Sequence, residues 1–233
     1  MQIPKIHNKG QAQLFNNRYL EHLTKTHPLV VWTLYTPMII FMLYYCGAAF
    51  KMSGLKIGLL FLTGAFSWSF FEYIMHRYVF HFMAESEKTL KIVYILHGNH
   101  HEYPRDKQRL LMPPVPSIIM AAAIFLSMYA IAFLAGLSYI VFAFFPGFIS
   151  GYLVYGTMHY AIHAFNPPFK WMKPLWRNHH LHHYKEQEKG FGVSSTLWDH
   201  VFGTMFDLKK EKEDTEKVND LKFITREPKA KIL

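Results

Sequence analysis

The sequence predicts an all-α integral membrane fold, in which four transmembrane helices form two hairpins and a cytosolic helical cap holds a dimetal site. Three observations support this prediction: four long apolar stretches, two very short connections between them, and 15 histidines in a chain of 233 residues. Hydrophobic residues make up 51% of the chain and aromatic residues 17%, which is rich for a soluble domain.

The four apolar stretches each approach the length at which a helix crosses the hydrocarbon core of a bilayer, roughly 30 Å. None of them carries a charge in its middle. The alternative is a soluble protein with four buried helices, but helices of soluble proteins normally show a polar face. We therefore expect membrane spans at about 29–50, 55–75, 117–136 and 138–157.

Short connections join these spans in pairs. Residues 51–54 link the first two spans and residues 136–138 link the last two, so both hairpins open toward the same side. Of the 25 lysines and arginines, 23 fall on that side, and an excess of positive charge marks the cytosolic side of membrane proteins. We expect a multi-pass protein with both termini and the metal site in the cytosol. Its membrane would be the endoplasmic reticulum in a eukaryote and the inner membrane in a bacterium.

The same asymmetry explains the formal net charge of +9. A basic chain can bind nucleic acid or an anionic lipid surface, and membrane orientation accounts for the charge here, so nucleic acid is not an expected partner. The single cysteine, Cys46, excludes an intramolecular disulfide. The chain then divides into a cytosolic N-terminal segment, 1–28, a membrane and cap domain, 29–208, with its histidine-rich cap at 76–116 and 158–208, and a charged C-terminal tail, 209–233.

Ten of the histidines form four clusters: two pairs that directly follow the second and fourth spans, and two H-x-x-H-H motifs farther along the chain. Residues three and four apart share one face of a helix, so each H-x-x-H-H motif is expected to point at one spot. The first pair is five residues apart, so its helix must end, bend or serve two ions. The clustered residues are His76, His81, His97, His100, His101, His159, His163, His179, His182 and His183.

This number of imidazoles favours two metal ions. Imidazole suits iron, zinc, copper and nickel, and ten ligands are too many for one ion. Five ligands for each ion leave one octahedral position open, whereas a structural zinc site is closed with four. A membrane metal transporter is a remote alternative, which would place ionisable residues inside the spans along an ion path. Here Glu72 and the histidines lie at the span ends.

The order H-x4-H, H-x-x-H-H, H-x3-H, H-x-x-H-H resembles the fatty acid hydroxylase superfamily of membrane di-iron enzymes, over about Trp68 to Thr204. Within that superfamily the chain is most similar to the fatty acid 2-hydroxylases, on the stretches Leu96–Glu102, Arg109–Pro116, Lys189–Ser195 and Leu197–Thr204. The resemblance implies that the ten histidines bind two iron ions, which zinc can replace in a purified sample. It also implies O2 as co-substrate and hydroxylation of a fatty acyl chain, favoured at C2 of a fatty acid or of a sphingolipid N-acyl chain. Sterol or carotenoid hydroxylation and lipid desaturation are alternatives within the superfamily.

Three further residues are expected to support the ligands. Asp199 is expected to orient a ligand imidazole through its free N–H, with a helix cap as the alternative. Glu72 lies just before His76, where a buried carboxylate needs a partner. His180 occupies an unassigned position of the last motif and is expected to contact the ligands or the substrate.

The resemblance also bears on the electron supply. Two-domain members of the superfamily carry an N-terminal haem cytochrome domain, whereas only 28 residues precede the first span here, without a His-Pro-Gly-Gly motif. We therefore expect a separate electron donor, either a small haem cytochrome or a ferredoxin with a reductase. The basic cytosolic face would attract an acidic partner of this kind.

Overall fold

The computed structural model describes residues 5–208. The predicted charged C-terminal tail lies outside this range. The described residues are helical, without strands, in the order α1 (Arg18–His22), α2 (Pro28–Ala48), α3 (Gly54–Ile74), η1 (Met75–Phe80), α4 (Glu87–Val93), η2 (Tyr94–Gly98), α5 (Asn99–Glu102), α6 (Pro114–Leu134), α7 (Ser138–Ala164), η3 (Lys170–Met172), α8 (Lys173–Tyr184) and α9 (Leu197–Val201).

Helices α2, α3, α6 and α7 are long and apolar enough to cross a membrane, with η1 continuing α3 to give 27 residues. Their ends lie within a few residues of the sequence prediction, with one exception. Helix α7 runs seven residues beyond position 157, to Ala164, so the end of this helix lies inside the predicted cap. The all-helical membrane fold with four candidate spans is therefore confirmed.

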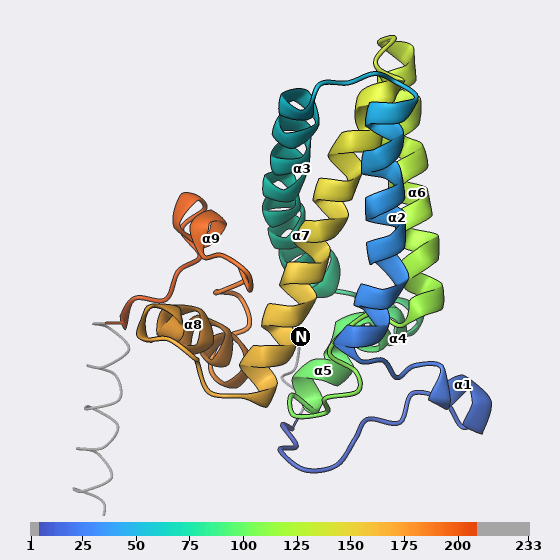
Figure 1. The fold of residues 1–233 in the computed structure, drawn as a ribbon. Coiled ribbons are helices and arrows are strands. Elements are labelled where there is room, and N and C mark those ends of the chain that lie inside the picture. Colours follow the sequence, from blue (N-terminus) through green and yellow to red (C-terminus); the bar gives the residue numbers. More distant parts are fainter. Residues whose placement is uncertain (1–4, 209–233) are drawn as a thin grey trace, which may run out of the picture.

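The two hairpins turn at the same end of the bundle (Figure 1). Lys51 and Gly136 have positive φ angles, 52° and 69°, in the two turns. Gly136 adopts this left-handed conformation without steric penalty and ends α6. The Lys56 ammonium donates a hydrogen bond to the Tyr139 hydroxyl at 3.2 Å, which ties the hairpins together beside the turns.

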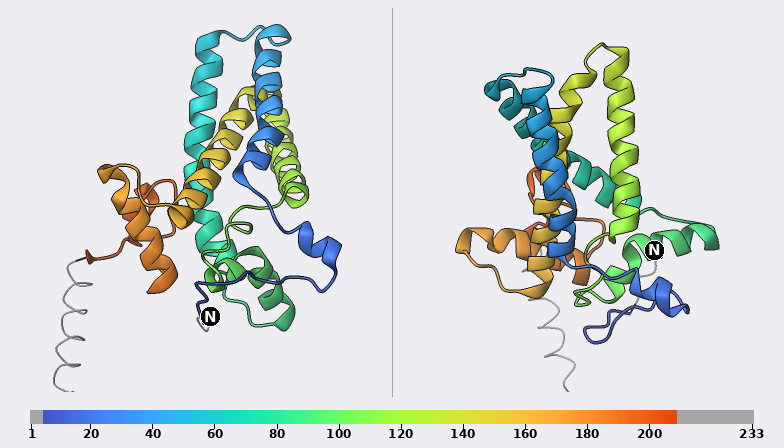
Figure 2. Two further views of the ribbon diagram at one scale, coloured as in Figure 1. Left: turned by 60° about the horizontal axis from the view of Figure 1, so that its bottom comes forward. Right: turned by 45° about the vertical axis from the view of Figure 1, so that its right-hand side comes forward.

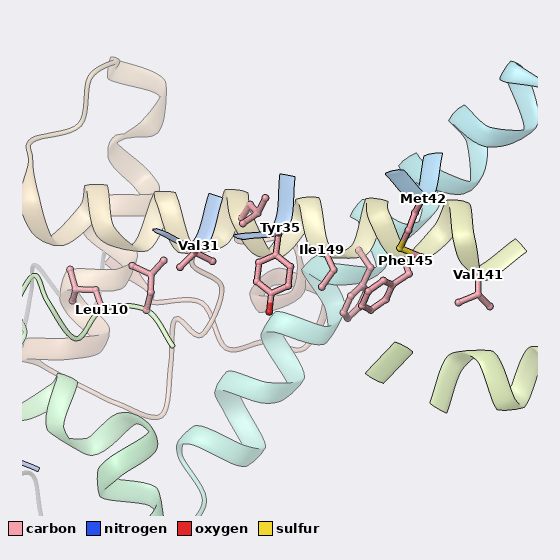
Figure 3. Close-up of a cluster of buried hydrophobic side chains, with 10 residues drawn as sticks. Val31, Tyr35, Met42, Leu110, Val141, Phe145 and Ile149 are labelled. Carbon is pink, nitrogen blue, oxygen red and sulfur yellow. The ribbon is translucent and has the colours of Figure 1, made fainter. Parts of the chain in front are cut away.

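Helix α7 lies at the centre of the bundle and packs closely against α3. A Cβ atom at Gly147 would overlap the carbonyl oxygen of Phe61, and one at Gly64 would overlap that of Phe144. Glycines at both positions let the two backbones approach, which is how helices associate within lipid. On its other side α7 packs against α2, where side chains such as Tyr35 interdigitate with the aromatic and aliphatic residues of α7 (Figure 3).

The shorter helices form a cap. Helices α1, α4, α5 and α8 lie at the end of the bundle opposite the hairpin turns (Figures 1 and 2). Helix α9 instead packs along α3, where the Trp198 ring lies 4.7 Å from the Phe70 ring and its indole N–H donates to the Ser69 hydroxyl at 3.0 Å. These contacts attach the cap to a membrane helix, in addition to the covalent connections of the chain.

Candidate metal centre

The ten clustered histidines converge at the cap end of the bundle in two groups of five. Within each group, one ligand atom from every ring lies within 4.8 Å of the others. Group A consists of His76, His81, His97, His101 and His182. Group B consists of His100, His159, His163, His179 and His183.

Each H-x-x-H-H motif is divided between the two groups, which corrects the expectation that a motif points at one spot. His97 and His101 belong to group A, while His100 between them belongs to group B. Helical residues are about 100° apart around the axis, so the i and i+4 rings are about 40° apart and the i+3 ring lies on the other side of the first. A helix beside two neighbouring sites therefore presents two rings to one and one ring to the other.

The second motif is divided in the same way, with the two groups exchanged. His179 and His183 belong to group B, and His182 belongs to group A. The two motifs thus link the groups from both sides. Each group takes a pair from one motif and a single ring from the other.

A π-helix explains the five-residue spacing of the first pair. Residues Met75–Phe80 form η1, in which the His81 backbone N–H donates to the His76 carbonyl oxygen at 3.2 Å. In this i to i+5 pattern each hydrogen bond spans one residue more than in an α-helix, so position i+5 returns to nearly the same face as position i. His76 and His81 therefore reach the same group. Such π-helical turns occur frequently at functional sites, and a second one, η2, carries His97.

Eight of the ten histidines are buried and two, His81 and His163, are partly buried, which favours the neutral form of the rings. Burial, reinforced by the neighbouring His101, lowers the pKa of His97 well below its usual range. Burial, and to a smaller extent the neighbouring His76, lowers the pKa of His81 to about 2. The pKa values of other group members outside the membrane helices are lowered in the same direction, again first by burial, as for His100, His101, His179, His182 and His183. A neutral imidazole keeps the lone pair that a metal ion needs.

Backbone carbonyl oxygens fix the orientation of three rings. The Nδ1 atoms of His76, His182 and His159 hydrogen-bond to the carbonyl oxygens of Phe191 at 2.5 Å, Lys189 at 2.7 Å and Leu110 at 3.0 Å, respectively. As donors, these Nδ1–H groups leave Nε2 as the lone-pair atom, in the arrangement that is usual for metal-bound histidines.

The nitrogens that face one another fit a cation. The Nε2 atom of His97 lies 3.1 Å from that of His76 and 2.9 Å from that of His101. In group B, the Nε2 atom of His179 lies 2.9 Å from that of His163 and 3.1 Å from that of His183. Such close nitrogens cannot all be satisfied by one another, because each neutral ring carries a single N–H.

Several buried ring nitrogens also lack a hydrogen-bond partner among the described residues, including Nε2 of His81 and of His182. Buried polar atoms are normally satisfied, and exceptions call for an explanation such as an ion. The residues of both groups therefore fit a divalent metal ion that binds imidazole.

Two buried carboxylates hold the loop that supports group A. Asp199 accepts hydrogen bonds from the backbone N–H groups of Phe191 and Gly192, both at 2.9 Å, and from the Thr204 hydroxyl at 2.7 Å. It therefore reaches the imidazoles of His76 and His182 through the loop that carries their acceptors, instead of contacting a ring as expected.

Glu72 acts from the membrane side on the next residues of the same loop. Its carboxylate accepts from the backbone N–H groups of Val193 at 2.8 Å and Ser194 at 2.9 Å. His180, by contrast, is exposed on α8, and its ring centroid lies 6.4 Å from that of His163. The structure thus places Glu72 beside the support of group A and leaves His180 outside both groups.

The sequence does not indicate that the carbonyl oxygens of Lys189, Phe191 and Leu110 orient ligand rings, because every residue carries a backbone carbonyl oxygen. One signal was available in the two glycines of the loop. Gly190 has a φ angle of 71°, and a Cβ at Gly192 would overlap the Ser195 carbonyl oxygen. A pair of glycines with such constraints indicates a tight loop that presents its backbone.

A cavity of about 460 Å³ leads from the histidines into the bundle. His97 of group A and His100 and His159 of group B line one part of it. Its lining continues along α3, α6 and α7 to Ile124 and Phe148, so most of the wall is apolar. This shape suits a hydrocarbon chain with one end beside both histidine groups.

Comparison with known proteins points to one enzyme family. The family described as fatty acid hydroxylase matches residues 61–204. A ceramide very long chain fatty acid hydroxylase of Saccharomyces cerevisiae is 40% identical over 206 residues, which cover 86% of this chain and 51% of the yeast protein. The chain therefore spans about half the length of that relative. A dihydroceramide fatty acyl 2-hydroxylase of Arabidopsis thaliana is 32% identical, with 84% of this chain and 81% of the plant protein covered.

A solved structure has the same fold. Full-length scs7p, with only its hydroxylase domain visible, superposes with a TM-score of 0.77 at 37% sequence identity. The match covers 87% of this chain and 75% of that chain.

Proposed function

This chain belongs to the fatty acid hydroxylase family, and on that premise we propose that it is a membrane di-iron monooxygenase that hydroxylates a fatty acyl chain at C2. The preferred substrate would be a fatty acid or a sphingolipid N-acyl chain, in line with the names of the yeast and plant relatives. The observation that carries the proposal is the apolar cavity, which ends at histidines of both groups.

Groups A and B would each hold one iron ion. When bound, the two ions would supply the activation of O2 that cleavage of an unactivated C–H bond requires. Overall, one oxygen atom would enter the substrate and the other would leave as water, with two electrons from a donor and two protons. The imidazole nitrogens suit zinc as well, so a purified sample can carry zinc.

The protein's own residues would select the position of attack. The cavity wall would hold the hydrocarbon chain in extended form and exclude water, so that one methylene is presented at the cavity's histidine end. Helix α7 lines the cavity with Phe148 and Tyr152 and also carries His159, which fixes the chain and the site relative to each other. The hydrogen bonds of Phe191 and Lys189 would keep His76 and His182 in the ligand tautomer.

The distribution of charge supports an orientation and an electron source. Both termini and the histidine groups would lie in the cytosol, because 23 of the 25 basic residues fall on that side. The membrane would be the endoplasmic reticulum or a bacterial inner membrane. A separate, acidic electron donor, either a small haem cytochrome or a ferredoxin with its reductase, would bind the basic cytosolic face.

Lipid analysis tests the proposal. The iron-loaded protein would be expressed in a host that lacks 2-hydroxy acids and supplies a reductant, and the hydrolysed lipids would be analysed by mass spectrometry. We expect 2-hydroxy acyl species, and none with a His100→Ala variant. An unsaturated product or a hydroxyl at another carbon would refute C2 hydroxylation, and a sterol or carotenoid product would refute the substrate class.

A further inference from the structure

The cavity has an exposed apolar rim on its cap side. Its lining includes Leu20 of α1, Leu23 directly after α1, Leu96 of η2, and Val115 and Met120 of α6. These five side chains are also exposed, with exposed fractions of 49%, 61%, 44%, 59% and 41%, respectively. Because Val115 and Met120 lie on the outer surface of a membrane helix, this rim opens sideways toward lipid.

Helix α1 forms the cap side of the rim and is held chiefly by polar contacts. None of its residues is buried. Glu21 accepts hydrogen bonds from the backbone N–H groups of Leu14 and Phe15, both at 2.9 Å, and forms an ion pair with Arg109. Leu14 and Phe15 line the cavity themselves, so the Glu21 carboxylate joins this part of the wall to the buried Arg109 of the cap.

Arg109 provides a fixed anchor for that carboxylate. Its guanidinium is buried and also pairs with Asp106 at 2.6 Å, within the loop that precedes α6. The Arg109 Nε–H donates to the Thr24 hydroxyl at 3.2 Å, just after α1. The anchor therefore belongs to the cap, so loss of the Glu21 contact would loosen α1, whose remaining ties include the hydrogen bonds of Thr24 and Gln11.

We propose that an acyl lipid enters the cavity sideways from the membrane, through a portal between α1 and the first turn of α6, and that the Glu21–Arg109 ion pair holds α1 as the wall of this portal. The identity of the ligand rests on the proposed function. Sideways entry lets the hydrocarbon chain pass from lipid into an apolar cavity while the polar head group stays at the interface, which avoids the cost of moving polar groups through the bundle.

Obstruction of the portal tests the route without any chemistry. The full chain, in phosphatidylcholine vesicles, would be mixed with a lipid whose acyl chain carries a diazirine, irradiated, and mapped by mass spectrometry. Cys46 is buried, so a thiol introduced by Val115→Cys reacts alone with a bulky maleimide. The matched control is Leu134→Cys, which is 87% exposed at the far end of the same helix.

We expect photolabelling of cavity residues such as Ile124 in the unmodified protein and in modified Leu134→Cys, and its loss in modified Val115→Cys. Equal labelling of the two modified variants, or no cavity labelling in the unmodified protein, would overturn the portal. Photolabelling needs neither iron nor O2. If cavity labelling follows this pattern but the iron-loaded protein forms no hydroxylated lipid, the portal stands and the proposed function fails.

Release of α1 tests the ion pair separately. In a Phe15→Cys background, Glu21→Gln should increase the rate of maleimide modification several-fold, because the cavity wall opens more often. Glu85→Gln, at an exposed position outside the cavity lining, is the matched control and should leave the rate unchanged. Equal rates for the two variants would show that the ion pair does not hold the wall.

Discussion

The Nδ1 atom of His76 hydrogen-bonds to the carbonyl oxygen of Phe191, which lies 115 positions later in the chain. One partner ends a membrane helix and the other belongs to a tight loop of the cap. The backbone of that loop is in turn held by Asp199 at Phe191 and Gly192. The orientation of rings in group A thus depends on a loop whose residues are not ligands. In group B, the ring of His159 is oriented by the carbonyl oxygen of Leu110.

Replacement of Asp199 should therefore weaken group A selectively. Asp199→Ala removes the acceptor for two loop N–H groups and frees the oxygens that orient His76 and His182. Loss of such indirect support typically weakens metal affinity roughly 10- to 100-fold. Metal titration of purified protein should show one weakened site and one intact site. The control is Glu188→Gln, at an exposed position near the same loop, which should leave both affinities unchanged. Two intact sites in Asp199→Ala would contradict the role of the loop.

The division of each motif between two groups predicts how ligand variants combine. His97→Ala and His182→Ala should both deplete group A, so the double variant should lose little more metal than either single variant. His97→Ala and His100→Ala fall in different groups, so their double variant should lose metal from both sites. Metal content per chain, measured by mass spectrometry, distinguishes these cases. Equivalent losses for both double variants would argue against two separate groups.

The metal-free protein should lose stability in mild acid. In the unfolded chain a histidine titrates near its ordinary pKa, about 6.5. In the fold, burial lowers the pKa of His97 well below this range and that of His81 to about 2. The unfolded state then binds more protons, so stability is present above about pH 6.5 and declines as the pH falls toward the folded values. Thermal unfolding of chelator-treated protein from about pH 8 to about pH 5 measures this, and a constant midpoint would contradict it.

The close contact of α3 and α7 makes Gly147 sensitive to any side chain. In Gly147→Ala the added Cβ would overlap the carbonyl oxygen of Phe61, so the helices must separate. Overpacking of this kind typically lowers the free energy of unfolding by about 1–3 kcal/mol. Gly58→Ala in α3 meets open space and is the control, expected to be neutral or slightly stabilising. Equal thermal midpoints for the two variants would show that the helices adjust without strain.

The cavity should set the length of the chain that the protein accepts. Ala121 of α6 lines the cavity, whereas its neighbour Ala122 is exposed on the same helix. Ala121→Phe should fill part of the space and shift the hydroxylated lipids toward shorter acyl chains, while Ala122→Phe should leave the distribution unchanged. Mass spectrometry of the acyl chains provides the comparison. An unaltered distribution in Ala121→Phe would place the substrate elsewhere.

The fold was largely predictable because membrane spans depend on local composition. Four apolar stretches and two short connections were sufficient for the helices and their pairing. Helix α7 continues beyond the predicted end of the fourth span at residue 157 and includes His159 and His163. They lie inside the helix because their rings are buried against other imidazoles, which composition alone does not reveal.

The convergence of the ten histidines was predictable from the sequence, and their division between groups A and B was not. Helical spacing places His97, His100 and His101 on one side of a helix, yet whether they serve one centre depends on where the other helices lie. The π-helical turn at Met75–Phe80 likewise becomes visible only in the fold, where His76 within it and His81 directly after it reach the same group. The oxygens of Lys189 and Leu110 act through the backbone, and their role becomes visible only in three dimensions.

Helix α7 runs without a break from the hairpin turn at Ser138 to Ala164, and it carries His159 and His163 at its far end. The height of these imidazoles above the hydrocarbon layer is therefore set by helical rise, about 1.5 Å per residue, and by any bend at Pro146 within the helix. A bilayer of different thickness must be met by tilting of the bundle, by bending at Pro146 or by deformation of the surrounding lipid. The length of α7 thus matches the protein to a particular thickness of the bilayer.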